Sequence, residues 1–189
     1  SDDSAMRAAA IDLAASWKME ELSAEVLQFA TDLSEATEVR CAAAKALLPL
    51  GAASATETLN ALSENPKNWQ LACAALGSWA QTDIAAAAKR ATELIESITT
   101  EQQASDLLAA ILVRKEGAAA LADALSGATI PSAAAGQLRR AASAAAVSHE
   151  RLTEVLDSAL GLKSVQRAHD PVWINALALE VLENGNAER

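Results

Sequence analysis

The sequence is poor in the residue types that carry most catalytic and redox chemistry. Its 189 residues include two cysteines, two histidines, one phenylalanine and no tyrosine, and aromatic residues make up only 3%. The seven glycines occur singly, so the glycine-rich loops that cradle phosphates or dinucleotides are missing. The sequence therefore gives no support for nucleotide chemistry.

Positive charge and long apolar runs are also scarce. There are 15 Lys and Arg residues against 25 Asp and Glu, a net charge of −10, and both halves of the chain are acidic. Because cationic side chains supply most nonspecific affinity for phosphate backbones, we expect no nucleic-acid partner. No uncharged apolar run is long enough to span a bilayer, and residues 1–4 do not resemble a signal peptide. We expect a soluble segment of a larger protein, with no membrane contact.

Alanine is what the chain has in abundance. It accounts for about a quarter of the residues, and hydrophobic residues as a whole for 51%. Alanine has the highest helix propensity, and its small side chain lets neighbouring helices approach closely. Scattered Leu, Ile and Val then provide most of the apolar area removed from water. This composition predicts an all-α protein with a thin core.

Short alanine-rich segments recur at intervals of roughly 32 to 36 residues, the range of solenoids built from helix pairs. They are Met6-Arg7-Ala8-Ala9-Ala10, Val39-Arg40-Cys41-Ala42-Ala43-Ala44, Gln70-Leu71-Ala72-Cys73-Ala74-Ala75 and Gln137-Leu138-Arg139-Arg140-Ala141-Ala142. Helical periodicity and cap or breaker residues predict helices over 4–17, 22–33, 37–49, 54–63, 68–81, 84–98, 101–115, 118–126, 132–147, 150–160 and 171–183. We predict one domain over 1–189, a right-handed α-solenoid of about five antiparallel helix pairs plus a terminal helix.

The segment from Val39 to Gly51, followed by an amphipathic stretch ending at Leu62, resembles the HEAT-repeat consensus of a Val-Arg-rich first helix and a Leu-rich second helix. This resemblance implies an armadillo-like scaffold for protein contacts. The segment from Lys115 to Pro131 looks like the helical region of large planctomycete proteins. In that family, HEAT-like repeats lie between a sorbosone-dehydrogenase-like propeller and a c-type haem domain.

The planctomycete resemblance implies a connecting scaffold in a periplasmic or exported bacterial protein, whereas without it a cytoplasmic location is expected. The haem attachment motif Cys-x-x-Cys-His is missing from this chain, and so is any propeller signature. We therefore expect no cofactor in this segment.

The two cysteines lie 32 residues apart, at equivalent places in adjacent repeats, so Cys41 and Cys73 should be neighbours across a helix interface. Stacked helices lie about 8–10 Å apart, whereas a disulfide needs Cα atoms within about 7 Å. We predict reduced core cysteines, with a redox pair as the alternative. His149 and His169 complete the inventory of a Cys₂His₂ zinc site, but ligands on distant repeats cannot converge, and we predict no metal site.

Other candidate residues have structural interpretations. In Ser148-His149-Glu150 the serine is expected to cap a helix rather than to act as a nucleophile, and His169 is expected to lie in a loop from 162 to 169. The carboxylate pairs lie near predicted helix starts or turns, where capping or solvation is favoured over a catalytic dyad. These pairs are Asp2 with Asp3, Glu20 with Glu21, and Glu35 with Glu38. We predict no catalytic residue.

Four tryptophans stand out in so aromatic-poor a chain: Trp17, Trp69, Trp79 and Trp173. We expect them to pack at helix ends, with the indole N–H near solvent or a loop carbonyl. The alternative is an exposed anchor for a partner, and solvent accessibility distinguishes the two. The basic pairs Lys89-Arg90 and Arg139-Arg140 are expected to be solvated rather than to form an anion site.

The sequence thus predicts a noncatalytic scaffold that contacts another protein or an adjoining domain of the same polypeptide, through a concave face of second helices. One alternative is a solenoid-fold enzyme, such as a HEAT-like bilin lyase or an alkylpurine DNA glycosylase. The glycosylase would need a basic groove, and the lyase a pocket with convergent polar groups. The other alternative is a purely structural linker.

Overall fold

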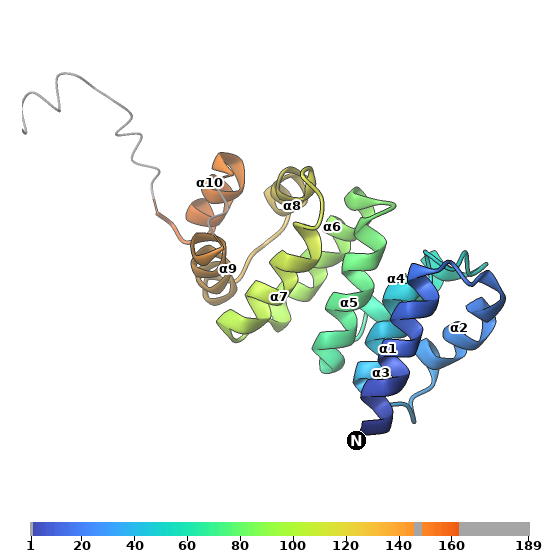
Figure 1. The fold of residues 1–189 in the computed structure, drawn as a ribbon. Helices are drawn as coiled ribbons and strands as arrows, with labels where there is room; N and C mark the ends of the chain where they lie inside the picture. Colours follow the sequence, from blue (N-terminus) through green and yellow to red (C-terminus); the bar gives the residue numbers. More distant parts are fainter. Residues whose placement is uncertain (1, 146–148, 163–189) are drawn as a thin grey trace, which may run out of the picture.

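The computed structural model describes residues 2–145 and 149–162, and every regular element in these ranges is helical (Figure 1). The α-helices are α1 (Asp2–Ser16), α2 (Ser23–Thr31), α3 (Thr37–Ala46), α4 (Ala55–Ser63), α5 (Trp69–Ala80), α6 (Ile84–Leu94), α7 (Glu101–Ile111), α8 (Gly117–Ser126), α9 (Ser132–Ala144) and α10 (Glu150–Ala159). Single 3₁₀ turns are η1 (Glu20–Leu22), η2 (Pro66–Asn68) and η3 (Ile95–Ser97). The prediction of an all-α protein is confirmed.

The predicted helix positions agree closely with these bounds for the first ten segments. The main differences are at C-termini: the helix expected over 84–98 ends as an α-helix at Leu94 and continues as η3, and the one expected over 101–115 ends at Ile111. The helix expected over 171–183 and most of the loop expected over 162–169 lie outside the described residues.

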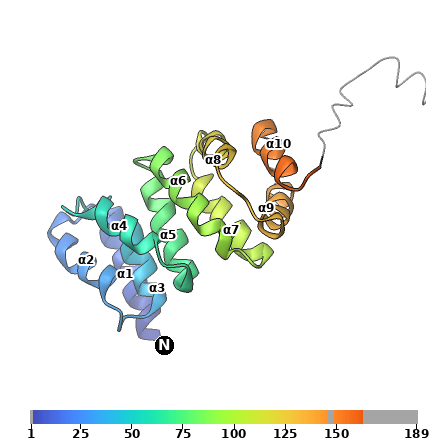
Figure 2. The ribbon, with the colours of Figure 1, turned by 180° about the vertical axis from the view of Figure 1, so that it is seen from behind.

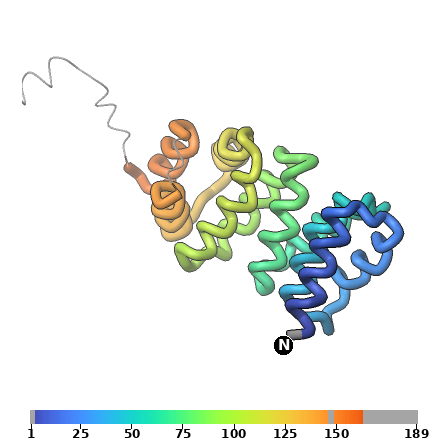
Figure 3. Tube along the Cα trace, viewed as in Figure 1, coloured from blue at the N-terminus to red at the C-terminus, as the bar shows by residue number. Residues whose placement is uncertain are grey.

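The helices are arranged in two rows. Each odd-numbered helix from α1 to α9 packs against the next odd-numbered one, and α6, α8 and α10 pack against one another in the same order. Figure 2 shows this succession from behind, and the tube in Figure 3 follows the chain from α1 at one end to α10 at the other. Each helix therefore finds its apolar partners in the helix pairs beside it.

Local chemistry sets the helix starts between the rows. The Thr100 hydroxyl accepts the Gln103 backbone N–H, while the Gln103 side chain accepts the Thr100 N–H, which forms a capping box for α7. Asp83 caps α6 by accepting the Ala86 N–H at 2.9 Å. Gly51 supplies the positive φ of 64° that the turn after α3 requires.

The core consists of two apolar clusters that meet at α5. One extends from α1 to α5, the other from α5 to α10, and Trp79 packs against both. Leucines that are completely buried recur along the chain and fill the space that the alanines leave: Leu47, Leu59, Leu76, Leu107, Leu121, Leu138 and Leu156. The thin core predicted from composition is therefore alanine at the close helix contacts and leucine between them.

One charged side chain is buried in the first cluster. Arg40, from the segment that resembles the HEAT consensus, is buried on α3, and its Nε donates a hydrogen bond to the Ala30 carbonyl at 3.2 Å. Ala30 lies in the last turn of α2, where carbonyls lack helical partners and the helix dipole favours a cation. Arg40 thus joins the two helices while satisfying a free carbonyl.

The corner between α7 and α8 has room only for glycine. The Gly117 N–H donates to the Arg114 carbonyl at 3.0 Å, and a Cβ on Gly117 would stand 2.1 Å from the Ile111 carbonyl oxygen. That oxygen belongs to the backbone at the end of α7, so it cannot move aside like the tip of a long side chain. The corner fixes how closely α8 follows α7.

We expect Gly117→Ala to lower the free energy of unfolding by about 1–3 kcal/mol or more, the usual cost of overpacking. Gly127→Ala at the end of α8 is the matched control, because a Cβ there meets nothing within 4 Å. Urea denaturation followed by circular dichroism measures both. Equal stability of the two variants would contradict the proposed clash.

Candidate functional site

An open groove of about 1090 Å³ crosses α1, α3, α5 and α7. Its lining residues come almost entirely from these odd-numbered helices: Ala8, Asp12, Glu38, Cys41, Ala42, Lys45, Gln70, Cys73, Ala74, Gly77, Ser78, Gln81, Gln102, Asp106, Ala109, Ala110 and Val113. These are the first helices of the predicted pairs. The groove therefore does not lie on the second-helix face where we expected a binding surface.

Helical periodicity explains why each helix gives one stripe to the groove. On α3 the stripe is Glu38, Cys41, Ala42 and Lys45, at spacings of three and four residues. The stripes of α5 and α7 have the same spacing. Because the three helices pack side by side in chain order, their stripes together form one continuous surface.

Small residues form the floor of this surface. At the α5–α7 crossing, a Cβ built on Gly77 would stand 3.4 Å from the Ala110 Cα, so the two backbones approach closely there. Ala74 and Ala109 extend the shallow floor on either side. A ligand could therefore lie near the helix backbones without a large side chain in its way.

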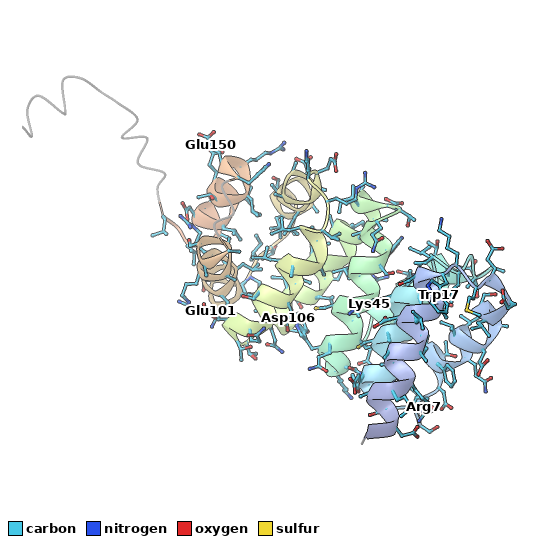
Figure 4. All side chains as sticks on the ribbon, viewed as in Figure 1. Arg7, Trp17, Lys45, Glu101, Asp106 and Glu150 are labelled. Carbon is cyan, nitrogen blue, oxygen red and sulfur yellow. The ribbon has the colours of Figure 1, made fainter. Side chains whose placement is uncertain are left out.

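The polar residues around the floor are mainly acidic or amide side chains. Carboxylates come from Asp12, Glu38 and Asp106, against the single cation Lys45. The Gln102 Nε2 donates to the Asp106 Oδ1 at 2.8 Å, which holds that carboxylate in place. Figure 4 labels Lys45 on α3 and Asp106 on α7, with α5 between these helices. The groove favours a ligand with positive charge.

Both cysteines lie in the groove and both are free thiols, in agreement with the prediction of reduced cysteines on adjacent first helices. Burial raises the pKa of the Cys73 thiol to about 12, with smaller contributions from Asp106 and from Cys41. Burial also raises the pKa of Cys41, although Lys45 and Arg40 oppose the shift. Both thiols therefore stay protonated at neutral pH, and neither is poised as a nucleophile.

We expect iodoacetamide to modify half-buried Cys41 before buried Cys73 in the folded chain. With a pKa of about 12, only about one Cys73 in ten thousand is a thiolate at pH 8, and each unit of rising pH increases that fraction about tenfold. Peptide mass spectrometry over time measures both rates. In guanidinium chloride the two rates should converge, and equal rates in the folded chain would contradict the prediction.

His149 does not join the cysteines in the groove. His149 occupies the N-cap of α10, where its Nδ1 accepts the Leu152 N–H at 3.3 Å, so the cap predicted for Ser148 belongs to its neighbour. Ser148 and His169 lie outside the described residues. Over residues 2–145 and 149–162, no three His, Cys, Asp or Glu side chains are grouped so that they could hold a metal ion.

Of the predicted carboxylate pairs, Glu35 and Glu38 have different surroundings. Glu35 accepts a hydrogen bond from Arg7 Nη1 at 2.6 Å, whereas Glu38 lies on the groove. Asp3 is 3.8 Å from Arg7, and Glu20 and Glu21 begin η1. The side chain of Asp2 lies outside the described part of the structure.

The predicted basic pairs are held mainly by neighbouring acids. Arg90 contacts Glu64 at 3.1 Å, pairs with Glu93 and donates to the Asn60 side chain at 2.8 Å. Arg139 donates to Asp157 at 2.8 Å, and Arg140 lies 3.6 Å from Glu101. These ion pairs favour the structural interpretation over an anion site, because the three arginines already have acidic partners.

The tryptophans divide into two groups. Trp69 and Trp79 pack into the core, but their indole Nε1 atoms are buried without a hydrogen-bond partner, so the expected carbonyl or solvent contact is not made. Trp17, by contrast, is 68% exposed at the end of α1. None of these three lines the groove, and Trp173 lies outside the described residues. Of the three described tryptophans, Trp17 is the one with the exposure that a partner anchor requires.

Sequence reasoning singled out Cys41, Cys73 and Glu38 but not the other charged and amide residues of the groove as candidate site residues. Gln81, Gln102 and Asp106 belong to no motif, and each is an ordinary polar residue in its own segment. A usable signal is their common register at three- and four-residue spacings on successive first helices. It becomes visible only when those helices are known to be neighbours.

The chain matches no protein-family model, no curated protein and no solved structure. The HEAT-like and planctomycete resemblances therefore rest on the sequence pattern alone. Within the described residues, no helix combines the length and apolarity that crossing a bilayer requires.

Proposed function

We propose that this chain is a HEAT-like α-solenoid scaffold without catalytic activity of its own, which binds a segment of another protein or of an adjoining domain. The groove across α1, α3, α5 and α7 is the observation that carries this proposal. A surface that draws residues from four stacked helices suits an elongated ligand, and extended surfaces of this kind are typical of solenoid proteins.

The chemistry of the groove narrows the ligand to a polypeptide segment that carries lysine or arginine. The three groove carboxylates exceed the one lysine, so an acidic ligand would be repelled. Gln70, Gln81 and Gln102 can each donate and accept hydrogen bonds, which suits the N–H and C=O groups of a peptide backbone. The floor of alanine and glycine allows that backbone to approach closely.

The protonation and placement of the reactive side chains support a binding role over a lyase or hydrolase role. The two thiols in the groove are kept protonated by burial, and His149 caps a helix outside it. Asp106 accepts a hydrogen bond from Gln102. No tryptophan is among the residues that line the groove, so they do not form the pocket that a lyase would need.

We expect peptides selected by phage display against the whole chain to be rich in lysine and arginine. Ala109→Trp should weaken their binding about tenfold or more, because the exposed Ala109 lines the groove on α7 and an indole there occupies the space of the ligand. The matched control is Ala85→Trp, which adds the same side chain at an exposed position of α6 outside the groove. Fluorescence anisotropy of labelled selected peptides gives the affinities.

Equal binding to both variants would place the selected peptides outside the groove and contradict the proposal. A selected pool without cationic residues would contradict the proposed ligand chemistry. Added salt should weaken binding, since the attraction is between partly exposed charges.

A further inference from the structure

The groove repeats one set of positions on three successive helices. The helices α3, α5 and α7 begin 32 residues apart, at Thr37, Trp69 and Glu101. The groove-lining residues follow the same interval, in three rows of equivalents: Glu38, Gln70 and Gln102; Ala42, Ala74 and Asp106; and Lys45, Gly77 and Ala109. Because α3 packs on α5 and α5 packs on α7, the members of a row follow one another across the groove at the spacing of neighbouring helices.

Small residues set this spacing. Packed helices generally lie about 8–10 Å apart, and the distance shortens as the side chains at the contact become smaller. Where α5 crosses α7, a Cβ built on Gly77 would stand 3.4 Å from the Ala110 Cα, so the contact is a close one. A ligand that runs across the helices therefore meets the same row about every 9 Å.

Polyproline II is the regular peptide conformation that fits this period and also leaves its backbone free. It has three residues per turn and rises about 3.1 Å per residue, so every third residue returns to the same side after about 9.3 Å. In a β-strand, residues three apart span about 10 Å but point to opposite sides. An α-helix returns a residue to one face after about 10.5 Å, but its backbone groups are bonded internally. A helical ligand would therefore leave the groove amides without backbone partners.

The row of Glu38, Gln70 and Gln102 offers partners to such a backbone, and we call it the rim row. Each is the second residue of its helix, and all three side chains are exposed. A glutamine amide can both donate to a C=O group and accept from an N–H group, and a polyproline II backbone keeps these groups free. Contacts with the rim row involve every third ligand residue, so the two residues between them need no backbone N–H. Proline, which lacks that N–H, suits those two positions.

The groove carboxylates on α3 and α7 fix where the cations of the ligand lie. Glu38 and Asp106 are two helices apart, about 16–20 Å, and the lining residues of α5 between them are neutral. Six residues of polyproline II span about 19 Å. Lys45, labelled with Asp106 in Figure 4, lies seven residues beyond Glu38 and so about 10 Å further along α3. The position beside Glu38 is therefore open to a cation of the ligand.

We propose that the ligand of the groove is a proline-rich segment in the polyproline II conformation, with two lysine or arginine residues six positions apart. A residue with a backbone N–H meets the rim row at every third position, and prolines occupy the positions between. Such a segment is already extended before it binds, so it loses little conformational entropy. This proposal rests on the proposed function of the groove as a peptide site, and it adds the conformation of the peptide and the spacing of its cations.

The test uses the whole chain and capped, fluorescein-labelled peptides of equal charge. The first peptide has two lysines six residues apart, an alanine midway and prolines elsewhere. The second has the same residues with the lysines four apart, which places them on different sides of a polyproline II helix. In the third and fourth, glycine or alanine replaces the prolines of the first. By fluorescence anisotropy, we expect the first peptide to bind at least about tenfold more tightly than the second, and several-fold more tightly than the others.

Variants of the chain connect this preference to particular side chains. Asp106→Asn should bring the first two peptides to roughly equal affinity, because one of the two separated carboxylates is lost. Glu57→Gln removes an exposed carboxylate of α4 outside the groove and should leave the preference unchanged. Gln70→Ala should weaken binding of the first peptide about fivefold, whereas Gln28→Ala, at an exposed position of α2, is the matched control. Circular dichroism checks that each variant is folded.

Failure of this inference can be distinguished from failure of the groove as a peptide site. If the first two peptides bind equally and Ala109→Trp weakens both, the groove binds cationic peptides, but the proposed conformation and spacing are wrong. Tightest binding of the alanine peptide, which forms a helix most readily, would also overturn them. Unchanged binding of the first peptide to Gln70→Ala would contradict contact with the rim row. If Ala109→Trp affects neither these peptides nor the selected ones, both proposals fail.

Discussion

The close side-by-side packing of alanine-rich, odd-numbered helices is the interaction on which the rest of this structure depends. Alanine at the contact points lets the backbones approach, as at the Gly77–Ala110 crossing, and buried leucines fill the space between contacts. Each interior odd-numbered helix packs against the odd-numbered helix on either side of it. Such a helix therefore needs two apolar faces. Within the described structure α1 packs against an odd-numbered helix on one side only, and Met6, Leu13 and Trp17 are exposed on it.

The same packing produces the groove. When small residues lie at the helix contacts, the layer has a shallow floor, and the longer polar side chains of each helix stand around it. The cysteines belong to this floor by register, and burial keeps them protonated. The two cysteines, which looked most like reactive groups in the sequence, therefore have a packing role. Glutamine and aspartate side chains instead define the surface that suits a ligand.

Charged side chains likewise act both within the fold and on its open surfaces. Several arginines are used within the fold: Arg40 holds the end of α2, Arg90 binds Glu64 and Asn60, and Arg139 binds Asp157. Because these arginines are already bound within the fold, the excess of acidic over basic residues is found on the exposed surfaces. The groove is acidic in this sense, with three carboxylates against one lysine, which disfavours a polyanionic ligand such as nucleic acid.

The sequence by itself determined the helices and most of their ends. Alanine content, periodicity and local caps such as Thr100-Gln103 and Asp83 act within a few residues, so they are readable before folding. Equivalent positions in the repeat also placed Cys41 and Cys73 on adjacent helices correctly. The N-cap of α10 is His149 rather than the predicted Ser148, because the geometry of one side chain decides between neighbouring candidates.

Only the tertiary structure decided where the groove and the exposed apolar side chains lie. The groove joins residues on α1, α3, α5 and α7 that are far apart in the chain, and no local pattern distinguishes Asp106 or Gln81 from other exposed polar residues. Likewise, Met6 and Val39 occupy the same place in the repeat, yet one is exposed and the other is buried. Their difference comes from which helices surround them, a nonlocal property that a short sequence window does not contain.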